Sequence, residues 1–427
     1  MISLALSRLF TMLGISLFSF QNVDILVLSS GTTNSEDKYD EIVKDLSKAA
    51  RNAGLYLVAN LNEKAVCQKK HEIVRSNIVF DRHGSIVSVY RKPATHTANC
   101  TTPTPGLATF TTDFNVTFGV MMEEDLVLKG AKLNGLKDFV VTGKWASEIP
   151  FLSAAQFTST WAYTVNANVL SRNGIFAGKS GVQTGSGRLL IGDLKRLDKD
   201  SVSNPPVVNP ASFPGEDLSQ FLIRPLNVEA SSKGYKETVC HNSFCCEFDV
   251  KTNLKGSKQE VNYGLAVFDG IRHYGRNHHI GTQNCALVAC AGLYKKSCNF
   301  GSINNNTNIS FEKLSITANF TQQNSVQYPV ILSNELLPAD RFSFTTKSDE
   351  KSKQVTISLT NSDNLMTFGI FGRDFDNDYE SLFENKDGGY GIYDYISTED
   401  LHDFFDYVWI RLRILIFIVS IYVLEMM

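Results

Sequence analysis

The sequence has no excess of basic residues, which limits the partners that the protein can bind. Its 427 residues include 41 lysines and arginines against 44 aspartates and glutamates, so the formal net charge at pH 7 is −3. A protein that binds nucleic acid neutralises phosphates with a surplus or a patch of basic side chains. We therefore expect no nucleic-acid partner.

Motifs of several enzyme classes are also missing. The chain has no Gly-x-Ser-x-Gly motif, which carries the nucleophile of α/β-hydrolases, and no glycine-rich phosphate loop of the Walker or dinucleotide type. Gly185-Ser-Gly187 is short and is interpreted as a turn. Internal repeats are absent as well, and the sequence predicts no cofactor.

The cysteines are distributed unevenly. Cys67 and Cys100 stand alone, whereas the other six crowd into one stretch: Cys240, Cys245, Cys246, Cys285, Cys290 and Cys298. A zinc site would need paired Cys or His arms, and the rings of the adjacent His278 and His279 would point to opposite faces of a strand. We therefore predict disulfide bonds among these six cysteines, formed in an oxidising compartment, and no metal site. Their pairing is left open.

Glycosylation sequons indicate the same compartment. They begin at Asn99, Asn115, Asn305, Asn308 and Asn319. The last three lie beside the cysteine cluster, and such sequons are used on the surface of secreted chains. We expect a glycoprotein that is secreted or displayed on the cell surface.

The N-terminal segment resembles a targeting signal. Residues 1–21 begin MISLALSRLFTMLGISLFSF, an apolar run with one arginine and no acidic residue, which is typical of a signal peptide. The run has a poor basic region and no Ala-x-Ala cleavage site. A buried helix, the remnant of a first helical unit, is therefore the alternative.

The C-terminal tail, residues 376–427, ends in an apolar run. Ile414 to Leu424 carries no charge, follows Arg411 and Arg413, and is too short by itself to cross a hydrocarbon core, which takes about 20 residues. With the small pair Ser397-Thr398 and a polar spacer before it, the tail resembles a GPI-anchor signal. We expect attachment to a membrane through this tail, with a single-span anchor as the alternative.

Residues 22–200 alternate between strand-like and helical patterns, which predicts a layered α/β domain. Val23 to Leu28 is an apolar strand pattern, and apolar residues then recur at helical spacing from Ile42 to Ala50. Gly54 is expected to end that helix before a strand over Leu55 to Leu61. Further expected elements are a hairpin around His83-Gly84, strands over Phe118 to Met122 and Phe139 to Thr142, and a helix over Leu152 to Asn166.

A cluster of prolines ends this pattern. Pro205, Pro206, Pro210 and Pro214 predict a linker over residues 201–225. From residue 226 to 375 the chain consists of strand-like runs separated by Asn, Ser and Gly, and it carries six of the eight cysteines. This composition predicts a second domain that is rich in β-strands.

Several short runs in both halves carry a further pattern. They are Tyr56-Leu-Val-Ala-Asn60, Asn77-Ile-Val-Phe-Asp81, Tyr90-Arg-Lys92, Thr117-Phe-Gly-Val120, Leu152-Ser-Ala-Ala-Gln-Phe157, Gly185-Ser-Gly187, Val239-Cys-His-Asn-Ser-Phe-Cys-Cys246, Ala266-Val-Phe-Asp-Gly270, Cys285 to Cys298 and Thr367-Phe-Gly-Ile-Phe-Gly-Arg373. In this order and spacing they resemble the vanin and biotinidase family of the nitrilase superfamily, over about Val23 to Phe375. The Cys-x4-Cys-Cys run in a β-rich domain points to that family more than to nitrilases at large.

The resemblance implies a nitrilase-type αββα sandwich followed by a β-rich, cysteine-containing domain. It also implies an amidase that cleaves the amide of pantetheine or biotinyl-lysine with a Glu, Lys and Cys triad. In that chemistry a thiolate attacks the carbonyl carbon, a carboxylate transfers protons, and an ammonium stabilises the oxyanion of the intermediate.

Only one residue of the triad is retained. Lys92, in Tyr90-Arg-Lys92, stands at the position of the family lysine. The family run Phe-Gly-(Ile/Val)-x-x-Cys-x-Asp corresponds to Phe118 to Asp125, which puts Glu123 in place of the nucleophile, and Ser30 stands in place of the general base. A carboxylate attacking an amide would form an anhydride, and losing a member of such a unit costs on the order of 10⁴ to 10⁶ in rate.

The leading hypothesis is therefore a vanin-like protein without amidase activity, acting as a binding or decoy module for a pantetheine- or biotinyl-amide-like ligand. The alternatives are an active pantetheinase- or biotinidase-like amidohydrolase and an extracellular adhesion module. In the implied fold Lys92 and Glu123 face one pocket, where we expect them to form an ion pair. Trp145 is expected to line this pocket, with a place in the core, the commoner position for tryptophan, as the alternative.

Overall fold

The computed structural model describes residues 23–28, 38–67, 70–93, 106–129, 135–143, 147–184, 192, 194, 215–255, 261–274, 278–292, 297–298, 308–321, 323–333, 341–348 and 352–380. One compact unit contains the chain up to Arg272 together with Ile280–Asp378. A second, small unit contains His273–His279 and the chain from Tyr379 onward. The site described below belongs to the first unit.

The first described elements form the predicted βαβ unit. Strand β1 (Ile25–Leu28) pairs in parallel with β2 (Tyr56–Cys67), and helix α2 (Tyr39–Ala53) connects them. The helix ends at Gly54, whose φ of 63° is a left-handed conformation that glycine adopts without a steric penalty. Strands β3 (Lys70–Phe80) and β4 (Ile86–Pro93) form the predicted hairpin and complete a sheet of order β1-β2-β3-β4.

A second sheet follows, with the order β10-β9-β8-β7-β6-β5. Strands β6, β7 and β8 pair in parallel at its centre. Helix α3 (Glu123–Leu128) follows β6, and α4 (Ala154–Val165) lies where the sequence predicts a helix. The strands of this sheet are β5 (Ala108–Thr111), β6 (Thr117–Met122), β7 (Asp138–Thr142), β8 (Asn168–Ser171), β9 (Gly174–Ala177) and β10 (Val182–Thr184).

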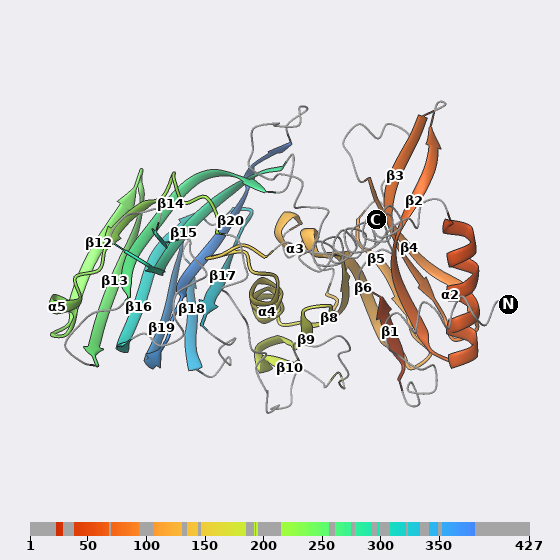
Figure 1. The fold of residues 1–427 in the computed structure, drawn as a ribbon, viewed down its shortest axis with the longest axis horizontal. Coiled ribbons are helices and arrows are strands. Elements are labelled where there is room, and N and C mark those ends of the chain that lie inside the picture. Colours follow the sequence, from red (N-terminus) through yellow and green to blue (C-terminus); the bar gives the residue numbers. More distant parts are fainter. Residues whose placement is uncertain are drawn as a thin grey trace, which may run out of the picture. The chain divides into compact units, whose positions relative to one another are not determined.

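The strands and helices of this half form layers (Figure 1), and alternating side chains of β2 pack against the layers on either side. Leu57 packs against α2 on one face of the first sheet, whereas Tyr56 and Val58 pack against the second sheet on the other. This alternation follows from the two-residue period of a β-strand. Beyond the second sheet, Phe139 of β7 meets Trp161 of α4 edge to face at 5.4 Å. The order helix, sheet, sheet, helix confirms the predicted αββα sandwich.

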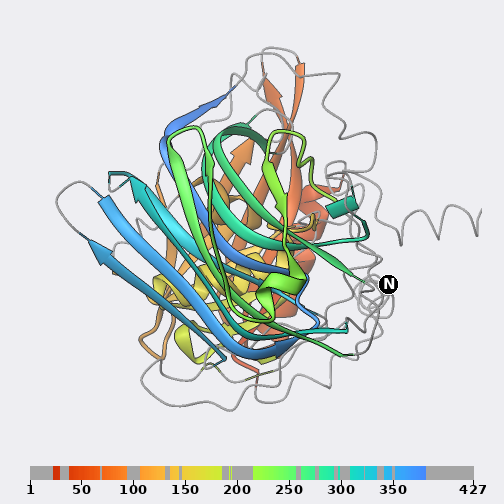
Figure 2. The ribbon, with the colours of Figure 1, turned by 90° about the vertical axis from the view of Figure 1, so that its left-hand side faces the viewer.

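The second half of the chain is rich in β-strands, as predicted, and these strands form a β-sandwich. Its strands face the viewer in Figure 2 and form two sheets, of the orders β11-β14-β15-β20-β17 and β12-β13-β16-β19-β18. The two sheets share one apolar core. Besides the short helix α5 (Val228–Ser231), its elements are β11 (Leu222–Pro225), β12 (Tyr235–His241), β13 (Phe244–Leu254), β14 (Asn262–Tyr274), β15 (His278–Cys290), β16 (Ile309–Thr321), β17 (Ser325–Leu332), β18 (Phe342–Ser348), β19 (Ser352–Asp363) and β20 (Thr367–Glu380).

Part of the segment predicted to be a linker belongs to this sandwich. Strand β11 pairs with β14, and just before it Glu216 is 1% exposed and accepts hydrogen bonds from the N–H groups of Phe151 (2.6 Å) and Leu152 (2.8 Å). Apolar side chains of this segment, such as Phe221, are buried and explain why it packs. The proline cluster itself lies outside the described residues.

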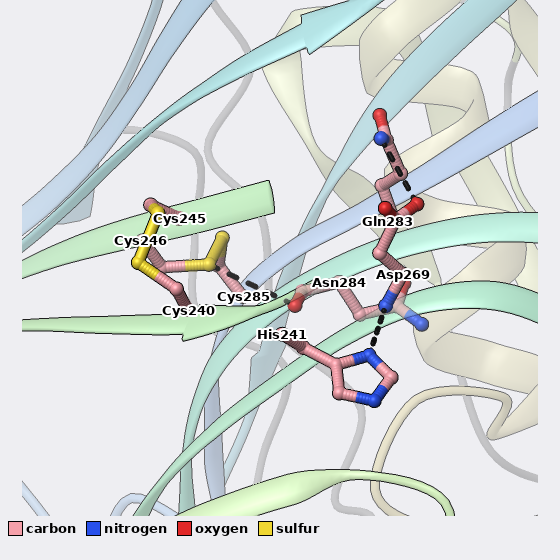
Figure 3. Close-up of a disulfide and its surroundings, with 8 residues drawn as sticks. All are labelled: Cys240, His241, Cys245, Cys246, Asp269, Gln283, Asn284 and Cys285. Atoms are coloured by element: carbon pink, nitrogen blue, oxygen red, sulfur yellow. Dashed lines mark hydrogen bonds between the residues drawn. A yellow bond between two sulfur atoms is a disulfide. The ribbon is translucent and has the colours of Figure 1, made fainter. Parts of the chain in front are cut away.

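All six clustered cysteines form disulfides, as the sequence predicts. The pairs, which the sequence left open, are Cys240–Cys245, Cys246–Cys285 and Cys290–Cys298. Cys240–Cys245 closes the β12–β13 hairpin, and Cys246–Cys285 joins β13 of one sheet to β15 of the other (Figure 3). The side chains of Cys67 and Cys100 are outside the described part of the chain.

Two of the predicted glycosylation sites have exposed side chains. Asn115 lies in the β5–β6 turn and Asn319 on β16, whereas Asn308 is half-buried. Asn99, Asn305, the N-terminal signal and the tail beyond residue 380 fall outside the described residues. Within the described ranges, no helix is both long enough and apolar enough to span a membrane.

A charged candidate site at helix α3

The predicted nucleophile position lies where a buried strand turns into a short helix. Strand β6 ends at Met122, and Glu123 is the first residue of α3. The turn is stabilised by Asp125, whose Oδ2 accepts a hydrogen bond from the Met122 N–H at 2.9 Å. A carboxylate in the first turn satisfies a free backbone N–H and complements the helix dipole.

Lys92 of β4 is held by two carboxylates of α3. Its Nζ lies 2.9 Å from Oε1 of Glu124 and 3.0 Å from Oδ1 of Asp125. The expected partner, Glu123, instead accepts a hydrogen bond from Nδ2 of Asn173 at 2.9 Å. The expected Lys92–Glu123 pair is thus replaced by pairs with the next two residues. The reason is the helical phase, because successive side chains on a helix diverge by about 100°.

Glu124 also binds a second cation. Arg75 lies opposite Lys92 in the β3–β4 ladder, and its Nη1 donates to Oε2 of Glu124 at 2.8 Å while its Nη2 binds Oε1. Burial by itself would raise the pKa of Glu124, but the charges of Arg75 and Lys92 outweigh it and lower that pKa to about 2. Glu124 is therefore ionised at neutral pH.

Asp125 is the most enclosed carboxylate of the site, with an exposure of 0%. Besides Lys92 and the Met122 N–H, it accepts a hydrogen bond from the Tyr90 hydroxyl at 2.8 Å, and Nζ of Lys129 lies 3.5 Å away. Burial, and then the nearby carboxylates of Asp125 and Glu124, raise the pKa of Tyr90. The tyrosine hydroxyl thus keeps its proton and donates a hydrogen bond to Asp125.

Lys129 gives the site a third cation. Its Nζ donates to the Tyr90 hydroxyl at 2.6 Å and lies 4.8 Å from the centre of the Tyr90 ring. The Lys129 side chain is 45% exposed, so this part of the site is open to solvent. An ammonium above an aromatic ring is a favourable arrangement.

A buried polar network holds the two sheets together beneath α3. Oδ1 of Asn77 accepts hydrogen bonds from Asn60 (2.7 Å) and Thr142 (2.6 Å), and its Nδ2 donates to the Met121 carbonyl at 3.1 Å. Asn77 is on β3, whereas Met121 and Thr142 are on strands of the second sheet. The network fixes the end of β6, from which α3 starts.

The structure therefore brings together only part of the predicted site. Lys92 and Glu123 lie at neighbouring elements, and Ser30 and Trp145 are outside the described residues. The six cysteine side chains that the structure describes are in disulfides, and no cluster of three or more metal-ligating side chains occurs among the described residues. The cluster has the chemistry of a polar ligand site, with hydrogen-bond donors and both signs of charge.

Sequence reasoning missed most residues of this cluster. Tyr90 and Asp125 belong to the sequence runs that resemble the family, so their closeness in sequence to Lys92 and Glu123 could have indicated that they lie at the site. Arg75 could have been found from the hairpin register, which places it opposite Lys92. Glu124 and Lys129 carry no signal beyond their charge.

Comparisons with known proteins place these observations in a family. Residues 212–378 match the family model of the Vanin C-terminal domain. Vanin-like protein 1 of Drosophila melanogaster is 30% identical over 408 residues, which cover 80% of this chain and 73% of that protein. Pantetheinase of Homo sapiens is 25% identical over 405 residues, covering 82% of this chain and 74% of the human protein.

A carbon-nitrogen hydrolase of known structure, from Helicobacter pylori G27, aligns with a TM-score of 0.33 and 16% identity over 46% of this chain and 82% of its own. The sequence identity to the fly protein extends over both halves of the chain, and the matched C-terminal model covers the β-sandwich with its disulfides. This chain is therefore a vanin-like member of the nitrilase superfamily.

Proposed function

We propose that this protein is a pseudoenzyme of the vanin family, which binds an amide ligand but does not cleave it by the cysteine route. The observation that supports the proposal is that the ammonium of Lys92 is engaged by Glu124 and Asp125. Glu123 is the residue that the family resemblance aligns with the nucleophile.

The first step of the cysteine route lacks its nucleophile. A thiolate attacks an amide carbonyl and leaves a thioester, whereas a carboxylate would have to form a high-energy anhydride. Glu123 is 3% exposed and shares a hydrogen bond with Asn173, which further limits its approach to a carbonyl carbon. We therefore expect no turnover by this residue.

Oxyanion stabilisation by Lys92 is weakened as well. A new negative charge at its ammonium would lie beside the carboxylates of Glu124 and Asp125, which already neutralise it. Two like unit charges about 4 Å apart repel by about 4 kcal/mol at an effective dielectric constant near 20. The lysine would thus favour a neutral, polar ligand over a tetrahedral oxyanion.

The ligand class follows from the relatives and from the exposed part of the site. Pantetheinases match this chain at 25% identity, and pantetheine carries amide and hydroxyl groups that hydrogen-bond without charge. The ammonium of Lys129, whose side chain is 45% exposed, offers such groups a hydrogen-bond donor at the open side of the cluster. A pantetheine-like or biotinyl-amide-like ligand fits this chemistry.

The proposed location is extracellular or at the cell surface. Three disulfides and the exposed sequon residues Asn115 and Asn319 support passage through an oxidising, glycosylating compartment. Attachment through the C-terminal tail is part of this proposal. Glycosidase treatment and mass spectrometry of the protein from a secretory host test it directly.

The functional test combines turnover with binding. Protein from a secretory host is incubated with pantetheine and with biotinyl amides, and calorimetry measures whether either binds. We expect binding without turnover. Turnover above buffer in the unmodified protein would contradict the pseudoenzyme assignment, and absence of both would favour the adhesion module.

A pair of double variants tests whether the missing triad residues are the reason for the expected lack of turnover. The double variant Glu123→Cys with Ser30→Glu restores the thiol and the carboxylate of the family triad, and we expect it to show measurable pantetheine hydrolysis. The matched control, Glu123→Ser with Ser30→Glu, differs by one atom in the nucleophile and should remain inactive because an unactivated hydroxyl is a poor nucleophile.

A further inference from the structure

A buried arginine of the β-sandwich binds the helix that carries the charged site. Arg373 of β20 is 0% exposed, and its Nε donates to the Val127 carbonyl at 2.9 Å. Its Nη2 donates to Asp378 at 2.6 Å, its Nη1 donates to the Gly281 carbonyl, and the guanidinium lies 4.5 Å from the centre of the Phe375 ring. These residues all belong to the same compact unit.

The bond to Val127 matters because α3 has only six residues. Helices shorter than about 12 residues are marginal by themselves, and the last carbonyls of any helix lack partners within it. Val127 is one residue from the C-terminal end of α3, so Arg373 supplies a donor and a positive charge where the helix dipole is negative.

Helix α3 is thus held from two sides. Arg75 and Lys92 bind its first turn from the hairpin of the αββα sandwich, and Arg373 binds its last turn from the β-sandwich. The positions of Glu124 and Asp125 relative to the two hairpin cations depend on both attachments.

We infer that Arg373 is a positioning residue, through which the disulfide-containing domain sets the geometry of the Arg75, Lys92 and Glu124 cluster on α3. The inference deepens the proposed function and rests on it only in that α3 carries the proposed ligand site. A purely structural role is the competing explanation, in which Arg373 joins only β15 and β20 through Gly281 and Asp378.

The test follows Glu124 and α3 in the ligand-free protein. In Arg373→Gln the helix loses its charged anchor, so the bidentate pair with Arg75 should loosen and Glu124 should begin to titrate near its ordinary value of 4.5. NMR of labelled glutamate carboxyls from neutral pH to about pH 3 measures this, since the unmodified Glu124 should stay ionised over that range. Amide exchange at Lys129, whose N–H bonds to the Asp125 carbonyl at 2.9 Å, should accelerate.

Matched variants separate positioning from general loss of stability. Like Arg373, Arg82 donates hydrogen bonds to carboxylate and carbonyl groups and contacts an aromatic ring, but it lies in the β3–β4 turn and does not contact α3 in the described bonds. Arg82→Gln is therefore the control. It should leave both readouts unchanged. Arg373→Lys keeps the charge and should shift the Glu124 titration less than Arg373→Gln does. If Arg373→Gln fails to fold, Asp378→Asn is measured in its place, and its effect on the Glu124 titration should be intermediate.

An unchanged Glu124 titration and unchanged Lys129 exchange in a folded Arg373→Gln or Asp378→Asn variant would overturn the inference. Both readouts are taken without ligand or substrate. If the positioning inference fails, the binding and turnover results still stand. If the protein proves to be an active hydrolase, the inferred role of Arg373 is unaffected.

Discussion

Arg75 and Lys92 lie opposite each other on β3 and β4 and bind the same carboxylate, that of Glu124. Two cations side by side on neighbouring strands would repel each other without it. Glu124 therefore stabilises the hairpin as well as α3, and Lys92 belongs to an ion cluster that joins the two elements.

Replacing this shared carboxylate should destabilise the protein. Glu124→Gln removes the carboxylate that Arg75 and Lys92 share, and because the Glu124 side chain is 24% exposed we expect a loss of about 1–3 kcal/mol, below the roughly 3–5 kcal/mol of a fully buried pair. Urea unfolding measures it. As a control, Glu312→Gln breaks the exposed pair with Lys251 and should cost less than about 0.5 kcal/mol.

The same carboxylate should contribute to acid unfolding. The pKa of Glu124 is lowered from 4.5 to about 2 in the folded protein, so the unfolded chain takes up this proton at a higher pH. Its contribution to stability is complete above pH 4.5 and is lost as the pH falls toward 2. Stability measured between about pH 5 and pH 3 should decline less steeply in Glu124→Gln than in the unmodified protein. Equal slopes would show that Glu124 is not held ionised.

The elements of the first sheet could be predicted because their signals are local. The sequence predicted α2 from the helical spacing between Ile42 and Ala50, and it predicted the end of the helix from Gly54. The carboxylates at Lys92 could not be predicted by the same means. Which of three consecutive acidic residues points at the lysine is decided by the phase of α3, and that phase is set by contacts with distant strands.

For the disulfides, too, the sequence predicted one feature and left another open. Six cysteines can pair in 15 ways, so the sequence predicted that they were bonded but not to which partner. The structure resolves the choice through the two faces of β13, where Cys245 is exposed and Cys246 is buried. The outward sulfur bonds to Cys240 across the hairpin, and the inward sulfur bonds to Cys285 of the other sheet.

Asp125 should be more important for folding than any other carboxylate of the cluster. It is fully buried and accepts hydrogen bonds from Tyr90, Lys92 and the Met122 N–H. Asp125→Ala takes the acceptor from the Tyr90 hydroxyl and the Met122 N–H and removes one of the two carboxylates at Lys92, and we expect a loss of about 3–5 kcal/mol in urea unfolding. Asp45→Ala, which removes only a 3.8 Å contact with Lys48, is the control and should cost less than about 0.5 kcal/mol. Similar losses in the two variants would contradict the assigned network.

The inter-sheet disulfide Cys246–Cys285 should stabilise the β-sandwich more than the short-range disulfide Cys290–Cys298. Cys246 and Cys285 are separated by 39 residues, and Cys290 and Cys298 by 8. A cross-link restricts the unfolded chain more when it closes a longer loop, which predicts losses of about 4 and about 2.5 kcal/mol for the paired alanine variants. Denaturant unfolding of each variant measures the difference. Because both variants lose two sulfurs, a larger loss for Cys290→Ala with Cys298→Ala would mean that packing, and not loop closure, governs their contribution.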